Sequence, residues 1–165
     1  MLGCGALGSK VSMNLARMGY TEQHFYDEDV ILPHNLVRHY ESGNYAVGHP
    51  KAEVMKIEMD CMFNDNNSTS HTENIFNTDI LPEGIVIDCT ASRRILFWAT
   101  LTDKIKSSMI RSEIYLGGKM GLTIIEGKKI KVEYSTAKPM QIDGETVTNV
   151  KCYVACAEEG IKNAF

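Results

Sequence analysis

The sequence predicts a mostly parallel, doubly wound α/β sheet with a β-hairpin toward its C-terminal end. Two observations predict it. Helical and strand patterns alternate through the first two-thirds of the chain, and the glycine-rich stretch GCGALG at residues 3–8 leads directly into the first helical pattern. The 165 residues, of which 44% are hydrophobic and 23% charged, suit one globular domain.

The first half of the chain carries two helical patterns. We expect helices at 7–18 and 51–63, a strand at 24–26, and a loop with one short helical turn at 30–48, where glycine and proline interrupt any periodicity. The apolar residues at helical spacing, which predict the buried faces, are Leu7, Val11, Leu15 and Met18 in the first helix and Val54, Ile57 and Cys61 in the second.

The second half is richer in β-branched runs. Its predicted elements are a strand at 72–76, a buried strand at 84–89, a helix at 91–105, a strand at 113–116, and a hairpin of strands at 122–125 and 130–134. The pattern after residue 135 is weak and shows no repeat, so no element is predicted there.

Composition excludes several classes of function. The formal net charge of −4 provides no basic field for holding nucleic acid. No apolar run is long enough to span a bilayer and no signal peptide is evident, so we expect a cytoplasmic protein without a membrane partner. The five cysteines are scattered and odd in number, which is typical of reduced thiols. Cys4 lies inside the glycine loop, where a small side chain is needed, and Cys61 and Cys89 fit buried core positions.

The glycine pattern, formed by Gly3, Gly5 and Gly8, is followed about 20 residues later by Asp27 at the end of the next predicted strand. Together they form a Rossmann-like nucleotide-binding fingerprint. The glycines allow phosphate close to the backbone, the helix N-terminus offers amide donors, and the carboxylate binds ribose hydroxyls. The alternative is a tight strand-to-helix turn without a ligand.

Residues beyond Asp27 favour a triphosphate over a dinucleotide. Arg38 and Lys51 could neutralise a triphosphate that would otherwise repel an incoming carboxylate. Taken singly, each also fits an ordinary exposed loop arginine or helix-start lysine. His34 and His39 flank the segment that carries Arg38, and we expect them to be surface residues that could touch phosphate.

The following motifs occur in order: Gly3-x-Gly5-x-x-Gly8, Asp27-x-Asp29, Asn35-Leu36-x-Arg38, Val47-Gly48-x-x-Lys51-Ala52 and Val86-Ile87-Asp88-Cys89-Thr90. With them the chain resembles the ubiquitin-activating-enzyme-like superfamily, of the ThiF, MoeB and HesA type. The resemblance extends more loosely through residues 115–118 and the hairpin, and so covers about residues 1–134.

This resemblance implies ATP-dependent adenylation of the C-terminal glycine of a small ubiquitin-like or sulfur-carrier protein, which would make the chain an adenylyltransferase. It implies that Asp27 holds the ribose, that Asn35 and Arg38 contact the phosphates, and that Lys51 neutralises the α-phosphate region. It also implies Mg²⁺ as a cofactor and a homodimer as the assembly.

One departure concerns the metal. Where the family usually has a second aspartate after the Asp88-Cys89-Thr90 segment, this chain has Ala91, which cannot bind magnesium. Asp29 or Asp88 would then be the remaining protein ligand. The departure leaves activity open, with a catalytically impaired partner-binding subunit as one alternative and an NAD-binding oxidoreductase as another.

Cys152 and Cys156 pose a second question about metals. They could form half of a Zn²⁺ site, one of them could act as a thioester nucleophile, or both could be ordinary thiols, which we favour because their spacing is one residue longer than the usual pair.

The start of the chain bears on domain organisation. A nucleotide-binding fold of this kind needs a first strand of about five residues before the glycine loop, and only Met1 and Leu2 precede it here. We therefore expect residues 1–165 to form a single nucleotide-binding domain with a truncated first strand, as a fragment of a longer protein.

Overall fold

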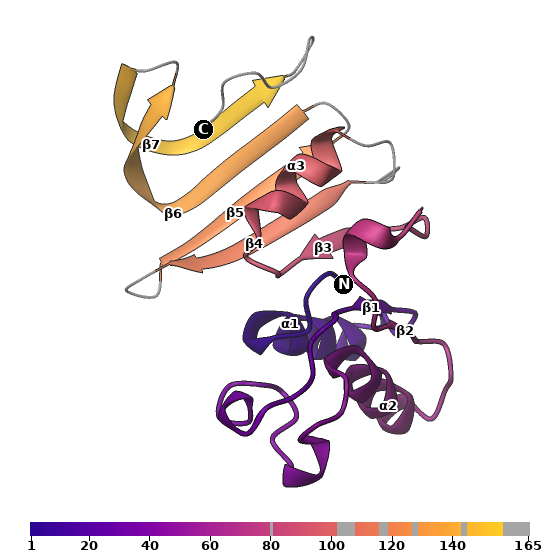
Figure 1. Ribbon diagram of the computed structural model, residues 1–165. Coiled ribbons are helices and arrows are strands. Elements are labelled where there is room, and N and C mark those ends of the chain that lie inside the picture. Colours follow the sequence, from indigo (N-terminus) through magenta and orange to yellow (C-terminus); the bar gives the residue numbers. More distant parts are fainter. Residues whose placement is uncertain (80, 102–107, 116–118, 127–128, 143–144, 157–165) are drawn as a thin grey trace. The chain divides into compact units, whose positions relative to one another are not determined.

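The computed structural model describes residues 1–79, 81–101, 108–115, 119–126, 129–142 and 145–156 (Figure 1). Its contacts divide the chain into two compact units. The first comprises residues 1–79 and 88–90, and the second comprises 80–87 and 91–165. The mixed α/β class is confirmed. Within the described residues, every helix is too short or too polar to cross a membrane.

The first unit contains α1 (Ala6–Arg17), β1 (His24–Tyr26), the 3₁₀ turns η1 (Pro33–Asn35) and η2 (Asn44–Ala46), α2 (Lys51–Phe63), β2 (Thr69–His71) and η3 (Ile75–Asn77). Strands β1 and β2 pair in parallel. Leu2 makes parallel bridges to both Tyr26 and Asp88, so it occupies the central strand position directly before the glycine loop. The predicted parallel arrangement is confirmed here.

The second unit contains α3 (Arg93–Leu101), β4 (Met109–Tyr115), β5 (Lys119–Glu126), β6 (Lys129–Ile142) and β7 (Glu145–Cys156), with most of β3 (Val86–Asp88). Strands β4 to β7 pair antiparallel in sequence order, orange to yellow in Figure 1. The predicted hairpin is confirmed as β5 and β6. Strand β7 was not predicted, because its pairing is fixed by β6 rather than by a regular apolar alternation of its own.

The strand predicted at 72–76 is wrong. The chain pairs earlier, in β2, and then forms the turn η3. The side-chain Oδ1 of Asn74 accepts the backbone N–H of Phe76 at 3.0 Å. An asparagine that bonds the backbone two residues on favours a turn over a strand ladder, which explains the difference.

Helix α1 has the predicted extent within one residue, but its most buried face differs from the predicted one. Leu7, Val11 and Leu15 are only partly buried, and Met18 is 73% exposed. The buried residues are Gly8, Ser9, Ser12, Met13 and Ala16. This face is made mainly of small residues, which lets the helix backbone lie close to its neighbours.

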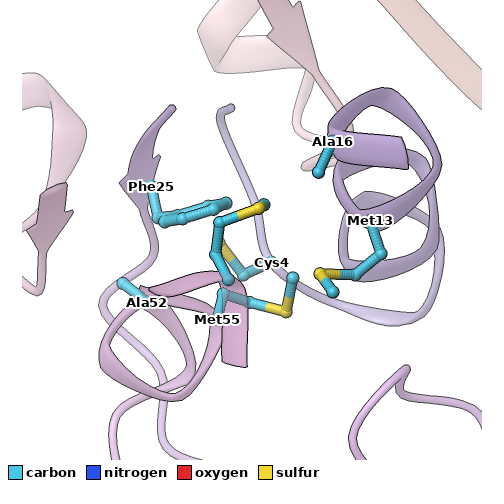
Figure 2. Packing of buried hydrophobic residues seen from close by; sticks show 7 residues of the cluster. Cys4, Met13, Ala16, Phe25, Ala52 and Met55 are labelled. Atoms are coloured by element: carbon cyan, nitrogen blue, oxygen red, sulfur yellow. The ribbon is translucent and has the colours of Figure 1, made fainter. Parts of the chain in front are cut away.

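The core of the first unit lies between α1, β1 and α2 (Figure 2). It contains Cys4, Met13, Ala16, Phe25, Ala52, Met55 and Met59. Cys4 is buried and Cys89 is half-buried, whereas the predicted burial of Ile57 and Cys61 is wrong. Helix α2 instead turns the row Lys51, Met55 and Met59, at i, i+4 spacing, away from solvent.

The sheet surface opposite Phe25 carries three aromatic rings. The Tyr26 and His71 rings stack with centroids 4.1 Å apart, and Nδ1 of His24 lies 3.4 Å from Nε2 of His71. Such a contact needs one donor and one acceptor, so it fits two neutral imidazoles. Burial lowers the pKa of both His24 and His71.

Because these pKa values lie below the ordinary histidine value of about 6.5, the unfolded chain binds protons first as the pH falls. We expect the free energy of unfolding to decrease as the pH is lowered from about 7 toward 5. His71→Phe keeps a ring against Tyr26 and removes one titrating group, so urea unfolding at several pH values should show a weaker pH dependence. The exposed His34, changed to Asn, is the control, and an unaltered slope in His71→Phe would contradict the assignment.

Candidate functional site

The glycine loop uses its three glycines differently. Gly3 has a φ of +81°, and its N–H donates to the Tyr26 carbonyl at 2.8 Å. A Cβ on Gly8 would lie 1.8 Å from the Gly3 carbonyl oxygen, whereas a Cβ on Gly5 would meet no described atom within 4 Å. The first and third glycines are therefore required by the fold itself, and the second faces open space.

Gly5 also caps α1 at its N-terminus. It has no side chain to accept a hydrogen bond from the first turn, and that turn contains no acidic residue. The first amides of a helix have no partner within the helix and carry the positive end of its dipole. The open space before Gly5 is therefore suited to an anion such as phosphate.

Asp27 connects this loop to the end of β1. Its Oδ2 accepts the N–H of Cys4 at 2.7 Å, and its Oδ1 accepts the N–H of Asp29 at 2.9 Å. Burial raises the pKa of Asp27, and the two N–H bonds and the charge of Lys51 partly offset that rise. Each carboxylate oxygen has a second lone pair with which to accept a hydroxyl.

Lys51 is the first residue of α2 and is 9% exposed. Its Nζ lies 2.6 Å from Oδ2 of Asp29, and its backbone N–H donates to the Asp29 carbonyl at 2.9 Å. The structure therefore joins the glycine loop, Asp27, Asp29 and Lys51 through consecutive contacts, as the sequence predicted for residues of one site.

Asn35 and Arg38 lie in the loop between β1 and α2. Oδ1 of Asn35 accepts the Leu32 N–H at 3.0 Å, so this oxygen holds the loop in shape. Arg38 is exposed, and its guanidinium makes no hydrogen bond or ion pair with the described residues 1–79. Their roles toward phosphate remain predictions.

The sequence pointed to His39 but not to its buried position or its contact with the glycine loop. It is 5% exposed, its Nε2 lies 2.8 Å from the Cys4 carbonyl oxygen, and its Nδ1 accepts the Glu41 N–H at 3.1 Å. These partners assign the proton to Nε2. Burial lowers the pKa of His39, which keeps the imidazole neutral. The expectation of a surface histidine is wrong, since no local pattern reveals a contact with a loop thirty-five residues away.

Next to His39, the Tyr40 N–H donates to Oγ of Ser9 in α1 at 3.0 Å. Two successive residues of the loop are thus fastened to the glycine loop and its helix. Arg38, which precedes them, is held close to the same region by its backbone.

Asp88 stabilises the turn that packs against the glycine loop. It is fully buried, and its Oδ1 accepts both the N–H and the hydroxyl of Thr90, at 2.9 and 2.6 Å. A Cβ on Gly3 would lie 3.0 Å from Thr90, so this turn packs directly on the loop. These contacts give Asp88 a structural role. Ala91 follows with a φ of +57°.

The carboxylates predicted as metal ligands have protein partners in this structure, and their role toward a metal stays a prediction. Asp88 is inaccessible, and Asp29 already pairs with the Lys51 ammonium. Cys152 and Cys156 lie in β7, at the register positions of Glu133 and Lys129 of β6, and their role toward zinc stays a prediction. Within the described ranges, no three His, Cys, Asp or Glu residues cluster around a possible cation.

Comparison with protein families matches residues 1–151 to the ThiF family. The chain belongs to the ThiF family. Among curated proteins, this ThiF-family chain is 28% identical over 102 residues to the ATP-dependent ubiquitin transferase-like protein Cap2 of Enterobacter hormaechei, covering 58% of this chain and 17% of that protein. It is 41% identical over 56 residues to the uncharacterized protein y4qC of Sinorhizobium fredii, covering 34% and 9%.

Solved structures confirm the fold. E. coli MccB with AMPCPP and MccA has a TM-score of 0.64 and 23% identity, covering 83% of this chain and 40% of that chain. E. coli tRNA N6-threonylcarbamoyladenosine dehydratase, TcdA, has a TM-score of 0.55 and 20% identity, covering 67% and 48%. The ThiF-family chain therefore spans less than half the length of these proteins.

Proposed function

We propose that the chain is the adenylation domain of an enzyme that activates the C-terminal carboxylate of a small protein. The candidate substrate is a ubiquitin-like or sulfur-carrier protein ending in glycine, and ATP is the co-substrate. The observation that carries the proposal is the open space at Gly5. The neighbouring Cys4 N–H donates to Asp27, the proposed ribose ligand, and Asp29 pairs with the buried Lys51. Structures of the same fold include MccB with ATP, and Cap2 is named as an ATP-dependent ubiquitin transferase-like protein.

In the proposed reaction, a carboxylate oxygen of the partner attacks the α-phosphorus of ATP. The new bond joins that oxygen to phosphorus, and the bond to the β-phosphate oxygen breaks, giving an acyl-adenylate and pyrophosphate. The amides at the start of α1 and the Lys51 ammonium offset the charge of the phosphates, so the approach of a second anion costs less. Asp27 fixes the ribose end.

Among the described residues no three carboxylates, histidines or cysteines gather around a possible cation, and we assign no step to a protein-bound metal. Mg²⁺ would arrive as part of the ATP substrate, held by the phosphates and water. A second copy of the chain is the expected assembly partner.

Gly5→Ala tests the nucleotide site. Its methyl group would enter the open space, so we expect the free energy of unfolding to change by less than about 1 kcal/mol, while ATP affinity falls at least about tenfold. Isothermal titration with ATP and chemical unfolding measure the two effects. Unchanged ATP binding would place the phosphates elsewhere, and binding of NAD with exclusion of ATP would favour the oxidoreductase alternative.

ATP–pyrophosphate exchange that depends on a small protein ending in glycine tests the reaction itself. A second candidate function, a nucleotide-binding subunit without turnover, is favoured by Ala91 and by the structural role of Asp88. ATP binding without exchange would support this second candidate over the first.

A further inference from the structure

The peptide between Cys4 and Gly5 is held on one side by His39. The Cys4 carbonyl oxygen, which belongs to this peptide, accepts from Nε2 of His39 at 2.8 Å. The Cys4 N–H belongs to the preceding peptide and donates to Asp27 at 2.7 Å. His39, which lies elsewhere in the chain, is therefore the side chain that sets the orientation of the Cys4–Gly5 peptide.

That orientation has a consequence for Gly5. The peptide is trans, so the Gly5 N–H points opposite to the Cys4 carbonyl, and hence away from His39. Glycine tolerates many backbone angles. Without a donor on the carbonyl, this peptide could rotate and present an oxygen atom to the phosphate in place of an N–H.

We propose that His39, as the neutral imidazole with its proton on Nε2, is a positioning residue that aims the Gly5 amide at the nucleotide phosphates. The inference rests on the proposed ATP site. His39 acts through the Cys4 carbonyl and does not itself touch the nucleotide. Its Nδ1, which accepts the Glu41 N–H, holds the ring in the required tautomer and ties the loop that carries Arg38 to the same peptide.

The charged groups around His39 come from two other segments of the chain. Lys51 at the start of α2 and burial favour the neutral imidazole, while Asp27 at the end of β1 and the carbonyls of Cys4 and Glu41 favour the protonated form. Burial is the largest of these influences. Nδ1 also lies 3.3 Å from the Glu41 carbonyl oxygen, so a hydrogen on Nδ1 would have an acceptor. Nε2 carries a hydrogen in the neutral and in the protonated ring, and the contact with Cys4 is kept in both.

Two variants of His39 distinguish the contact that Nε2 makes with Cys4 from the contact that Nδ1 makes with Glu41. In His39→Gln the amide nitrogen takes the place of Nε2 and still donates to Cys4. In His39→Asn the shorter amide takes the place of Nδ1 and does not reach Cys4. We expect His39→Asn to weaken ATP binding about tenfold and adenosine binding, which involves no phosphate, by less than about twofold, whereas His39→Gln stays within about threefold of wild type for both.

The measurement is titration calorimetry of the full chain with ATP and with adenosine. Equal loss of both ligands in His39→Asn, or loss of neither, would overturn the inference, because a general structural role does not distinguish them. If wild type fails to bind ATP, the proposed function itself is wrong.

His39→Gln keeps the inference testable if His39→Asn does not fold. Because its amide still donates to the Cys4 carbonyl, the ATP affinity of this variant should stay within about threefold of wild type. A loss of ATP affinity of about tenfold or more in folded His39→Gln would overturn the inference.

Discussion

Replacement of Lys51 with methionine is expected to reduce pyrophosphate exchange by a factor on the order of 10²–10³. Methionine keeps an unbranched apolar stem in the buried position but removes the charge that offsets the phosphates. The Asp29 side chain left without its partner is 68% exposed and can be solvated. The free energy of unfolding should therefore change by less than about 1 kcal/mol.

Lys56 offers a matched control on the same helix. It pairs with Asp60 four residues on and lies away from the glycine loop contacts. Lys56→Met should leave exchange unchanged. Full exchange activity in Lys51→Met would remove the central assignment of this lysine, and an equal loss in both variants would indicate a general effect on α2.

Gly8→Ala is expected to lower the free energy of unfolding by about 3 kcal/mol. The added Cβ would lie 1.8 Å from the Gly3 carbonyl oxygen, and this neighbour is backbone in the turn that packs on Thr90. Either the helix moves away from the loop or the turn opens. Urea unfolding with Gly5→Ala as the matched control measures the difference.

The stabilities of Gly5→Ala and Gly8→Ala together test the close approach of α1 to the glycine loop. Gly5→Ala should keep the fold and lose ATP, whereas Gly8→Ala should lose stability before any ligand is added. Equal stability of the two variants would contradict the close approach of α1 to the glycine loop.

Local patterns predicted the elements that depend on local chemistry. Helix α2 has the predicted bounds, 51–63, because Pro50 precedes it and Asn64 ends it in a left-handed conformation. The buried face of α1 could not be predicted from apolar spacing. Its small residues are buried because the glycine turn brings the helix close to its neighbours, a tertiary effect that hydropathy does not record.

The candidate site divides in a similar way. The glycine loop, Asp27 and Lys51 follow recognisable spacing, and the structure joins them. His39 and Asp88 acquire their roles through contacts with Cys4 and Thr90, which depend on the folded path of the chain. A histidine after a loop arginine gives no sign in the sequence of whether its ring faces solvent or a buried carbonyl.

The ion pair between Lys51 and Asp29 has a consequence for the effect of ionic strength. If a phosphate binds the Lys51 ammonium, it displaces the Asp29 carboxylate, which belongs to the same chain. Lys51 therefore has an anionic partner before and after binding. Few solution ions are released in that exchange. Added salt should therefore weaken nucleotide binding less than it would at a lysine that has no anionic partner before the nucleotide binds. Asp29 acts as a counterion supplied by the protein itself.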